Sequence, residues 1–279
     1  MSQLIQLRQR IRAIETIKKI THAMRLISMS SHTRMRTREE PFTFYLRTLQ
    51  QLTQLVKEMP HCPSPLSVAP LKSDLHLIIL VGSQRGLCGN FNTLLFHFFE
   101  QHTKLENYIV IPVGRKAVNY CLRKNYKHAL SFPYLIVSNT GSLASDIVEY
   151  IQSHQKHFAS VSVISNQLKT FFIQKPQRTF LMPQEETFHA AENKASAHEY
   201  IWEQSPEELI AFLATEQLHA QLQYLLFQSL LAEQAARFIS MDSATRNAQN
   251  ILDATKLSYN KLRQAKITKE LTELTGTLT

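Results

Sequence analysis

The chain has 279 residues, of which 44% are hydrophobic and 19% are charged. This composition can form a folded core, and it excludes an intrinsically disordered chain. No run of about 18 apolar residues is present, so the sequence predicts no membrane-spanning helix. Three cysteines, Cys62, Cys88 and Cys121, form neither a disulfide framework nor a metal-type pair, which is typical of a reducing compartment.

Proline and glycine are concentrated in the middle of the chain. All ten prolines lie between Pro41 and Pro206, and so do five of the six glycines. Residues 1–40 and 207–275 therefore lack the two residue types that most strongly interrupt helices. The sequence predicts two helical ends around a mixed middle.

The formal net charge of +9 is unevenly distributed. Residues 1–38 hold nine basic residues and one acidic residue, whereas residues 207–279 hold seven basic and eight acidic residues. A basic helical end must be solvated or must face a negative partner. Nucleic acid, an anionic membrane and an acidic protein surface are the alternatives.

Residues 1–59 are predicted to be helical, with two sets of apolar residues at 3-4-3 spacing. This spacing is typical of a coiled coil, and the step of three between the sets resembles a stammer. An amphipathic helix packed on a globular core is the alternative. Pro41 is expected to kink or restart the helix, and further prolines place a linker over residues 60–74. The two sets are Leu4, Leu7, Ile11 and Ile14, then Ile17, Ile20, Met24 and Ile27.

Residues 75–205 have the pattern of an α/β domain, in which strands and helices alternate. Such an order favours a layer of parallel strands. Residues 184–199 are polar and are expected to form a loop. The predicted strands cover residues 75–81, 108–113, 161–164 and 170–174, and the predicted helices cover 92–100, 115–124 and 142–154.

A long helix is predicted over residues 206–279, because Ser205, Pro206 and the two following glutamates form a strong helix start. A break near residues 240–243 is one possibility. About seventy helical residues would extend on the order of 100 Å, so the helix must leave a compact domain or bend. Leu218–Leu231 is expected to be buried by the α/β layer. Beyond it the expected inward set is Ala244, Ala248, Ile251, Thr255, Ser258 and Leu262.

Residues 82–90 form a glycine-containing loop between a predicted strand and a predicted helix. That context suits phosphate binding, which an isolated α/β enzyme would need, but the loop lacks the endings of known phosphate-binding motifs. A tight structural turn is the preferred interpretation, with Arg85 exposed at a partner surface. No metal-binding cluster and no combination of nucleophile, base and orienting group is evident. The sequence therefore predicts neither catalysis nor a bound cofactor or metal.

Several motifs resemble the gamma subunits of F-type ATP synthases. The strongest are ARFISMDSATRNA at 236–248 and YNKLRQAKITKELTE at 259–273. Residues 11–25, the RGLCG sequence at 85–89 and residues 200–203 also have counterparts. Departures occur at Gln84, where the family usually has an acid, and in the residues that follow Arg25.

The resemblance implies a fold of class α/β, with a long antiparallel coiled coil formed by the N- and C-terminal helices plus a central Rossmann-like domain. The implied function is that of a non-catalytic rotor shaft that couples H⁺ or Na⁺ flow to ATP synthesis or hydrolysis. The implied partners are the alpha and beta subunits, which bind ATP, ADP and Mg, together with the epsilon subunit and the rotor c-ring. The implied location is the cytoplasmic face of a bacterial plasma membrane.

The resemblance also assigns roles to individual residues. The departures leave room for a divergent second F-type ATPase that acts mainly as an ion pump, and a basic coiled-coil protein that binds nucleic acid is the remote alternative. The central α/β domain is implied to be the foot of the shaft, and its contacts with the rotor ring and the epsilon subunit are implied for Arg85, Tyr200, Trp202 and Glu203. Contacts between shaft and head are implied for Met24, Arg25, Arg237, Arg263, Gln264, Thr268 and Glu273.

Overall fold

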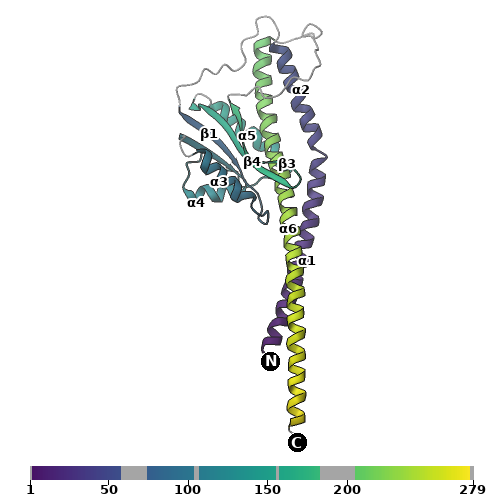
Figure 1. Ribbon diagram of the computed structural model, residues 1–279. Helices are drawn as coiled ribbons and strands as arrows, with labels where there is room; N and C mark the ends of the chain where they lie inside the picture. Colours follow the sequence, from purple (N-terminus) through teal and green to yellow (C-terminus); the bar gives the residue numbers. More distant parts are fainter. Residues whose placement is uncertain (1, 58–73, 104–106, 155–156, 183–204, 277–279) are drawn as a thin grey trace. The chain divides into compact units, whose positions relative to one another are not determined.

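The computed structural model describes residues 2–57, 74–103, 107–154, 157–182 and 205–276 (Figure 1). The chain divides into two compact units. We call residues 1–30 with 237–279 the helical pair, and residues 31–236 the α/β unit. Helices α1 (Ser2–Arg36) and α6 (Pro206–Gly276) each contribute to both units.

The α/β unit contains a four-stranded sheet in the order β2-β1-β3-β4. Strand β1 (Leu75–Val81) pairs in parallel with β2 (Asn107–Val113) and with β3 (Ser160–Thr170). Strand β4 (Ile173–Met182) is antiparallel to β3. The predicted α/β layer is confirmed, but the expectation of parallel strands is wrong for β4.

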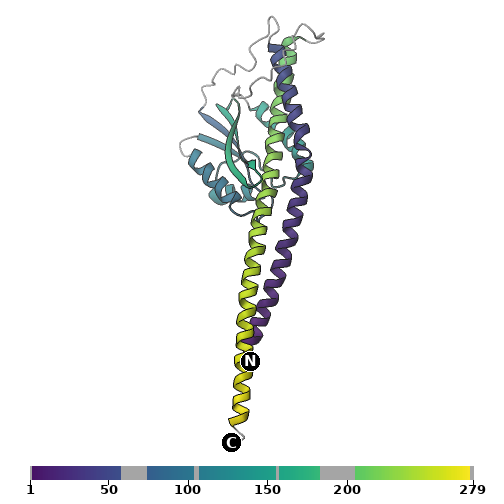
Figure 2. The same ribbon diagram turned by 45° about the vertical axis from the view of Figure 1, so that its right-hand side comes forward.

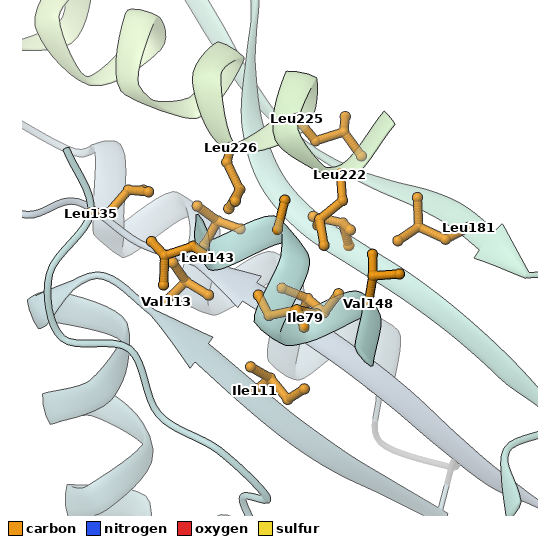
Figure 3. Close-up of a cluster of buried hydrophobic side chains, with 14 of the residues drawn as sticks. Ile79, Ile111, Val113, Leu135, Leu143, Val148, Leu181, Leu222, Leu225 and Leu226 are labelled. Atoms are coloured by element: carbon orange, nitrogen blue, oxygen red, sulfur yellow. The ribbon is translucent and has the colours of Figure 1, made fainter. Parts of the chain in front are cut away.

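Helices cover both faces of this sheet. Helices α3 (Phe91–Thr103) and α4 (Arg115–Lys124) pack on one face. Helix α5 (Thr140–Ser153), which follows the short 3-10 helix η1 (Val137–Asn139), packs with α6 on the other. Figure 3 shows the larger core, in which leucines of α6 meet side chains of α5 and of the strands.

Strand β1 carries apolar residues at almost every position because both of its faces are buried. Leu77 and Ile79 point toward α5 and α6, whereas Ile78 and Leu80 point toward α3 and α4, and all four are fully buried. A strand covered on both faces carries apolar side chains at consecutive positions. The predicted burial of Leu218–Leu231 is confirmed by its leucines in the same core.

Helix α2 (Glu39–Lys57) lies beside α6 within the α/β unit (Figure 2). Leu49 and Val56 belong to a buried cluster with residues of α6, and the ring of Phe42 stacks on Phe227 with 5.1 Å between centroids. The interruption before α2 falls at residues 37–38, and Pro41 lies in the first turn, where a missing N–H costs no helical hydrogen bond. The expected restart near Pro41 is therefore confirmed.

Two other predictions about elements need correction. The segment 170–174, expected to be one strand, is divided: Thr170 ends β3, Phe171 and Phe172 form the turn, and Ile173 begins β4. Phe172 is 73% exposed. The aromatic and β-branched residues of this segment favour a strand locally, but the paired strands turn there. The possible break at residues 240–243 is absent, because α6 is helical throughout. The loop predicted at 184–199 lies outside the described residues, as does the linker at 60–73.

Candidate interface along the helical pair

In the helical pair, α1 runs antiparallel to the second part of α6. The ion pair between Glu15 Oε1 and Lys256 Nζ spans 2.9 Å, and the one between Arg25 Nη1 and Asp242 Oδ1 spans 2.6 Å. Residue numbers therefore rise along one helix as they fall along the other. A small apolar cluster of Ile11, Ile14, Ala248 and Leu252 lies at one end of this seam.

Beyond Ile14 the seam of α1 becomes polar. Continuing the 4-3 spacing from Ile14 gives Lys18, Thr21, Arg25 and Ser28, which are buried or half-buried. Lys18 donates to the Gln249 side chain, and Thr245 Oγ1 donates to Thr21 Oγ1 at 3.0 Å. Ser28 satisfies its hydroxyl within its own helix, at the carbonyl of Met24. The heptad therefore continues in register, with hydrogen bonds where a coiled coil normally has apolar side chains.

The second apolar set of α1 lies on the outside of the pair. Ile17, Ile20 and Ile27 are 53%, 54% and 65% exposed, and Met24 is half-buried. We call these four residues the outer stripe. The predicted stammer is therefore wrong: one apolar stripe ends at Ile14, and a second stripe with the same spacing runs along a different face of the helix.

In the part of α6 that packs against α1, some apolar side chains likewise face outward. Ala248 and Thr255 are buried as expected, but Ile251 is 48% exposed and the adjacent Leu252 is buried in its place. The expected inward positions Ser258 and Leu262 are also exposed. Further apolar side chains with large exposed fractions are Leu257, Ile267 and Leu271.

Ion pairs across the seam change the acidity of their carboxyl groups. Hydrogen bonding from Arg25, helped by the nearby Arg246, lowers the pKa of Asp242. A hydrogen bond from Lys256 likewise lowers the pKa of Glu15. Both pairs are partly exposed, so water and salt screen the attraction between their charges. The contacts that join the helices are therefore individually weak and sensitive to salt.

The residues predicted for shaft and head contacts are distributed along the pair and do not form one pocket. Met24 and Arg25 lie on α1, while Arg237 is buried on α6. The other four, Arg263, Gln264, Thr268 and Glu273, are exposed on α6. From residue 237 to 273 the helix extends on the order of 50 Å. The seven residues therefore mark an elongated surface along the helical pair.

Of the four residues predicted to contact the rotor ring and the epsilon subunit, the structure describes one. Tyr200, Trp202 and Glu203 lie outside the described residues. Arg85 is exposed, and its backbone N–H donates to the carboxylate of Glu233 at 3.3 Å. The glycine-containing loop is thus a structural turn held by α6, in agreement with the preferred interpretation.

Sequence reasoning missed the polar partners on α6. Asp242, Thr245 and Gln249 meet α1 at three successive levels of the seam. The signal was available, because extending the 4-3 spacing past Ile14 regardless of polarity reaches each of their partners. The pattern of apolar residues alone leads instead from Ile14 to the outer stripe.

Within the described part of the chain, no group of three or more His, Cys, Asp or Glu side chains is placed to hold a metal ion. Burial raises the pKa of the Cys121 thiol to about 12, so this cysteine stays protonated and unreactive at neutral pH. Among the described helices, none is long and apolar enough to cross a membrane.

Comparison with known proteins identifies the relatives of this chain. A family model described as ATP synthase matches residues 3–279. An ATP synthase gamma chain of Chlorobium phaeobacteroides is 30% identical over 288 residues, covering 99% of this chain and 98% of the relative. A gamma chain of Rickettsia prowazekii is 29% identical, with 98% of each chain covered.

The fold has solved counterparts. A chain in the rotor of the Euglena gracilis mitochondrial ATP synthase superimposes with a TM-score of 0.71, at 14% identity, covering 95% of this chain and 99% of that one. A chain in the central stalk and c-ring structure from Tetrahymena thermophila gives a TM-score of 0.55. At these identities the structures support the fold, and the sequence relatives support the family. The chain belongs to the ATP synthase gamma chain family.

Proposed function

We propose that this chain is the central-stalk gamma subunit of an F-type ATP synthase, and that its helical pair turns inside a head of alpha and beta subunits. The rotation would couple the flow of H⁺ or Na⁺ to ATP synthesis or hydrolysis at the beta subunits. The outer stripe carries this proposal. Ile17, Ile20 and Ile27 are exposed at regular spacing, and such an apolar surface marks an interaction site.

The polar seam supports the same function. A shaft that is enclosed by its partners can bury its outer apolar side chains against them and does not require a strong internal core. Asymmetric contacts would offer each beta subunit a different face in turn and would bias its conformational equilibrium. Met24, Arg25 and the exposed residues near the end of α6 are proposed to make these contacts. The basic surface of residues 1–38 then has an acidic protein partner.

The loop after β1 supports a non-catalytic role. In a phosphate-binding loop the backbone N–H groups face the ligand. Here the N–H groups of Gln84 and Arg85 donate to the carboxylate of Glu233. We infer that nucleotides bind to the alpha and beta subunits, and that the purified chain binds none. Equilibrium dialysis with ATP and Mg tests this inference, because saturable binding would favour the enzyme alternative.

The remaining partners follow from the family. We propose that Arg85, Tyr200, Trp202 and Glu203 contribute to contacts with the rotor c-ring and the epsilon subunit. The chain would then be peripheral to the membrane, on the cytoplasmic face of a bacterial plasma membrane. Crosslinking from cysteines placed at these positions would reveal the neighbours in the assembled enzyme.

The direct test of the function is reconstitution of alpha and beta subunits with and without this chain. We expect one copy per head and a change in ATP turnover when the chain is added. Failure to assemble, or an ATP turnover rate that is the same with and without the chain, would contradict the proposal.

A charge-reversal experiment tests the contact assignment. The double variant Met24→Glu and Arg25→Glu should assemble but pump fewer ions per ATP hydrolysed. Lys127→Glu, a charge reversal at an exposed position of the α/β unit, serves as the control. Equal coupling in both variants would remove Met24 and Arg25 from the interface.

A further inference from the structure

A buried carboxylate joins the loop after β1 to the long helix α6. Of the carboxylates in the described ranges, only Glu233 is buried, with 2% of its surface exposed. The N–H of Gln84 donates to its Oε2 at 2.9 Å, and the N–H of Arg85 donates to its Oε1 at 3.3 Å. Burying a carboxylate is costly unless hydrogen bonds replace its water, and bonds to a charged acceptor are the strong ones. Both oxygens of Glu233 are used in this way.

The loop that Glu233 holds is itself braced. Asn92 accepts a hydrogen bond from the N–H of Ser83 at 3.1 Å and donates to the Ser83 hydroxyl at 2.8 Å. That hydroxyl donates to the carbonyl of Arg85 at 2.8 Å. Leu87 has a positive φ of 64°, which a bulky residue adopts only when its surroundings enforce it. The loop therefore has a fixed shape that α6 can hold as a unit.

Apolar contacts surround the carboxylate. Cys88 and Phe91 belong to one buried cluster with Ala232 and Ala236 of α6. The two alanines lie on either side of Glu233 in the sequence, and their small side chains allow close approach. Hydrogen bonds are directional, whereas apolar contacts are not, so the carboxylate provides the resistance to sliding along the helix.

We propose that Glu233 is a positioning residue that locks the loop after β1 onto α6, so that the sheet and the long helix turn as one body. This inference rests on the proposed function, in which α6 carries rotation into the head. Helix α6 is continuous from Pro206 to Gly276, so the helix that holds Glu233 also supplies Asp242 and Leu252 to the helical pair. Torque applied at the sheet would be transmitted to α6 through the hydrogen bonds that Glu233 accepts from the loop.

The variant Glu233→Gln tests the lock, because an amide keeps the size of the side chain but offers one acceptor oxygen in place of two. Glu216→Gln is the matched control on the same helix, where the carboxylate contacts the Tyr45 hydroxyl at 3.4 Å. In the full chain, amide exchange at residues 84 and 85 should accelerate about tenfold to hundredfold in Glu233→Gln. Exchange at Ile79, inside β1, should be unchanged in both variants.

The second measurement is coupling in the reconstituted enzyme. With Glu233→Gln the head should still hydrolyse ATP, but fewer ions should be pumped per ATP than with the wild-type chain or with Glu216→Gln. Glu233→Asp keeps the charge on a side chain shorter by one CH₂, and it should restore part of both readouts. If Glu233→Gln unfolds, as accelerated exchange at Ile79 would reveal, the aspartate variant carries the test.

The outcomes separate the two proposals. A wild-type chain that does not join alpha and beta subunits would overturn the proposed function itself. Normal coupling by a variant whose amides at 84 and 85 have lost protection would overturn the role of the lock in rotation. Unchanged protection of these amides would overturn the lock, whatever the coupling.

Discussion

The two units of this chain place apolar residues in opposite ways. The α/β unit buries them in several clusters, of which the two largest lie on opposite faces of the sheet, and α6 supplies leucines to the larger of these two. The helical pair has a polar seam with a small apolar cluster, and it exposes the isoleucines of its outer stripe. The difference indicates that the α/β unit is stabilised from within, whereas the helical pair depends on partners around it.

The largest effect on stability should come from the core of the α/β unit. Phe227 is fully buried and stacks on Phe42. The change Phe227→Ala should lower the free energy of unfolding by about 3–5 kcal/mol. Phe212→Ala, on an exposed residue of the same helix, should change it by less than about 0.5 kcal/mol. Urea unfolding measures both, and similar losses would contradict the assignment of the core.

Substitutions in the seam of the helical pair should lower the free energy of unfolding by less than substitutions in the core of the α/β unit. Leu252 is buried in the small cluster, while its neighbour Ile251 faces outward. Leu252→Ala should cost about 2 kcal/mol, the low end of the range for buried leucines, because few apolar neighbours surround it. Ile251→Ala should leave amide exchange in this part of α6 almost unchanged. A larger effect from Ile251 would reverse the assigned inner and outer faces.

A smaller effect is expected at His32, a buried residue of the α/β unit whose Nε2 has no hydrogen-bond partner. Burial, with a contribution from Arg36, lowers the pKa of His32. The unfolded chain then binds more protons, so stability should fall as the pH drops below about 6.5. His32→Leu should stabilise the unit by about 1 kcal/mol and flatten this pH dependence. Stability curves from pH 7 to 5 test both effects.

The smallest effect concerns the ion pair between Arg25 and Asp242. Its lowered pKa means that Asp242 contributes stability above the ordinary aspartate pKa, and that this contribution is lost as the pH falls below about 4. Asp242→Asn should remove at most about 1 kcal/mol at neutral pH, because the pair is partly exposed. The loss should shrink with added salt. A salt-independent loss of several kcal/mol would show that the pair is a core interaction.

The sequence predicted the elements of the α/β unit well because local signals and burial agree there. Strand β1 is apolar at every position but His76, and α4 has the predicted bounds of residues 115–124. The direction of β4 was not predictable, because antiparallel pairing is decided by a reversal at Phe171 and Phe172, which have strand-like propensity. The faces of α1 were misassigned because burial there follows position in the heptad and not polarity. Both kinds of error arise where tertiary contacts override local pattern.

The outer stripe provides the most direct measurement. The triple variant Ile17→Ser, Ile20→Ser and Ile27→Ser should fold normally, while its affinity for reconstituted alpha and beta heads falls. Fully burying an isoleucine side chain contributes about 1.5–3 kcal/mol, and these three are already about half covered. The head would therefore gain about 2–4 kcal/mol from them together, so the dissociation constant should rise roughly thirtyfold to thousandfold. The control combines Leu94→Ser with Leu122→Ser, which are exposed leucines of the α/β unit, and should bind like the wild type. Equal affinity of the triple variant, the control and the wild type would contradict the account, because the exposed isoleucines would then have no partner in the head.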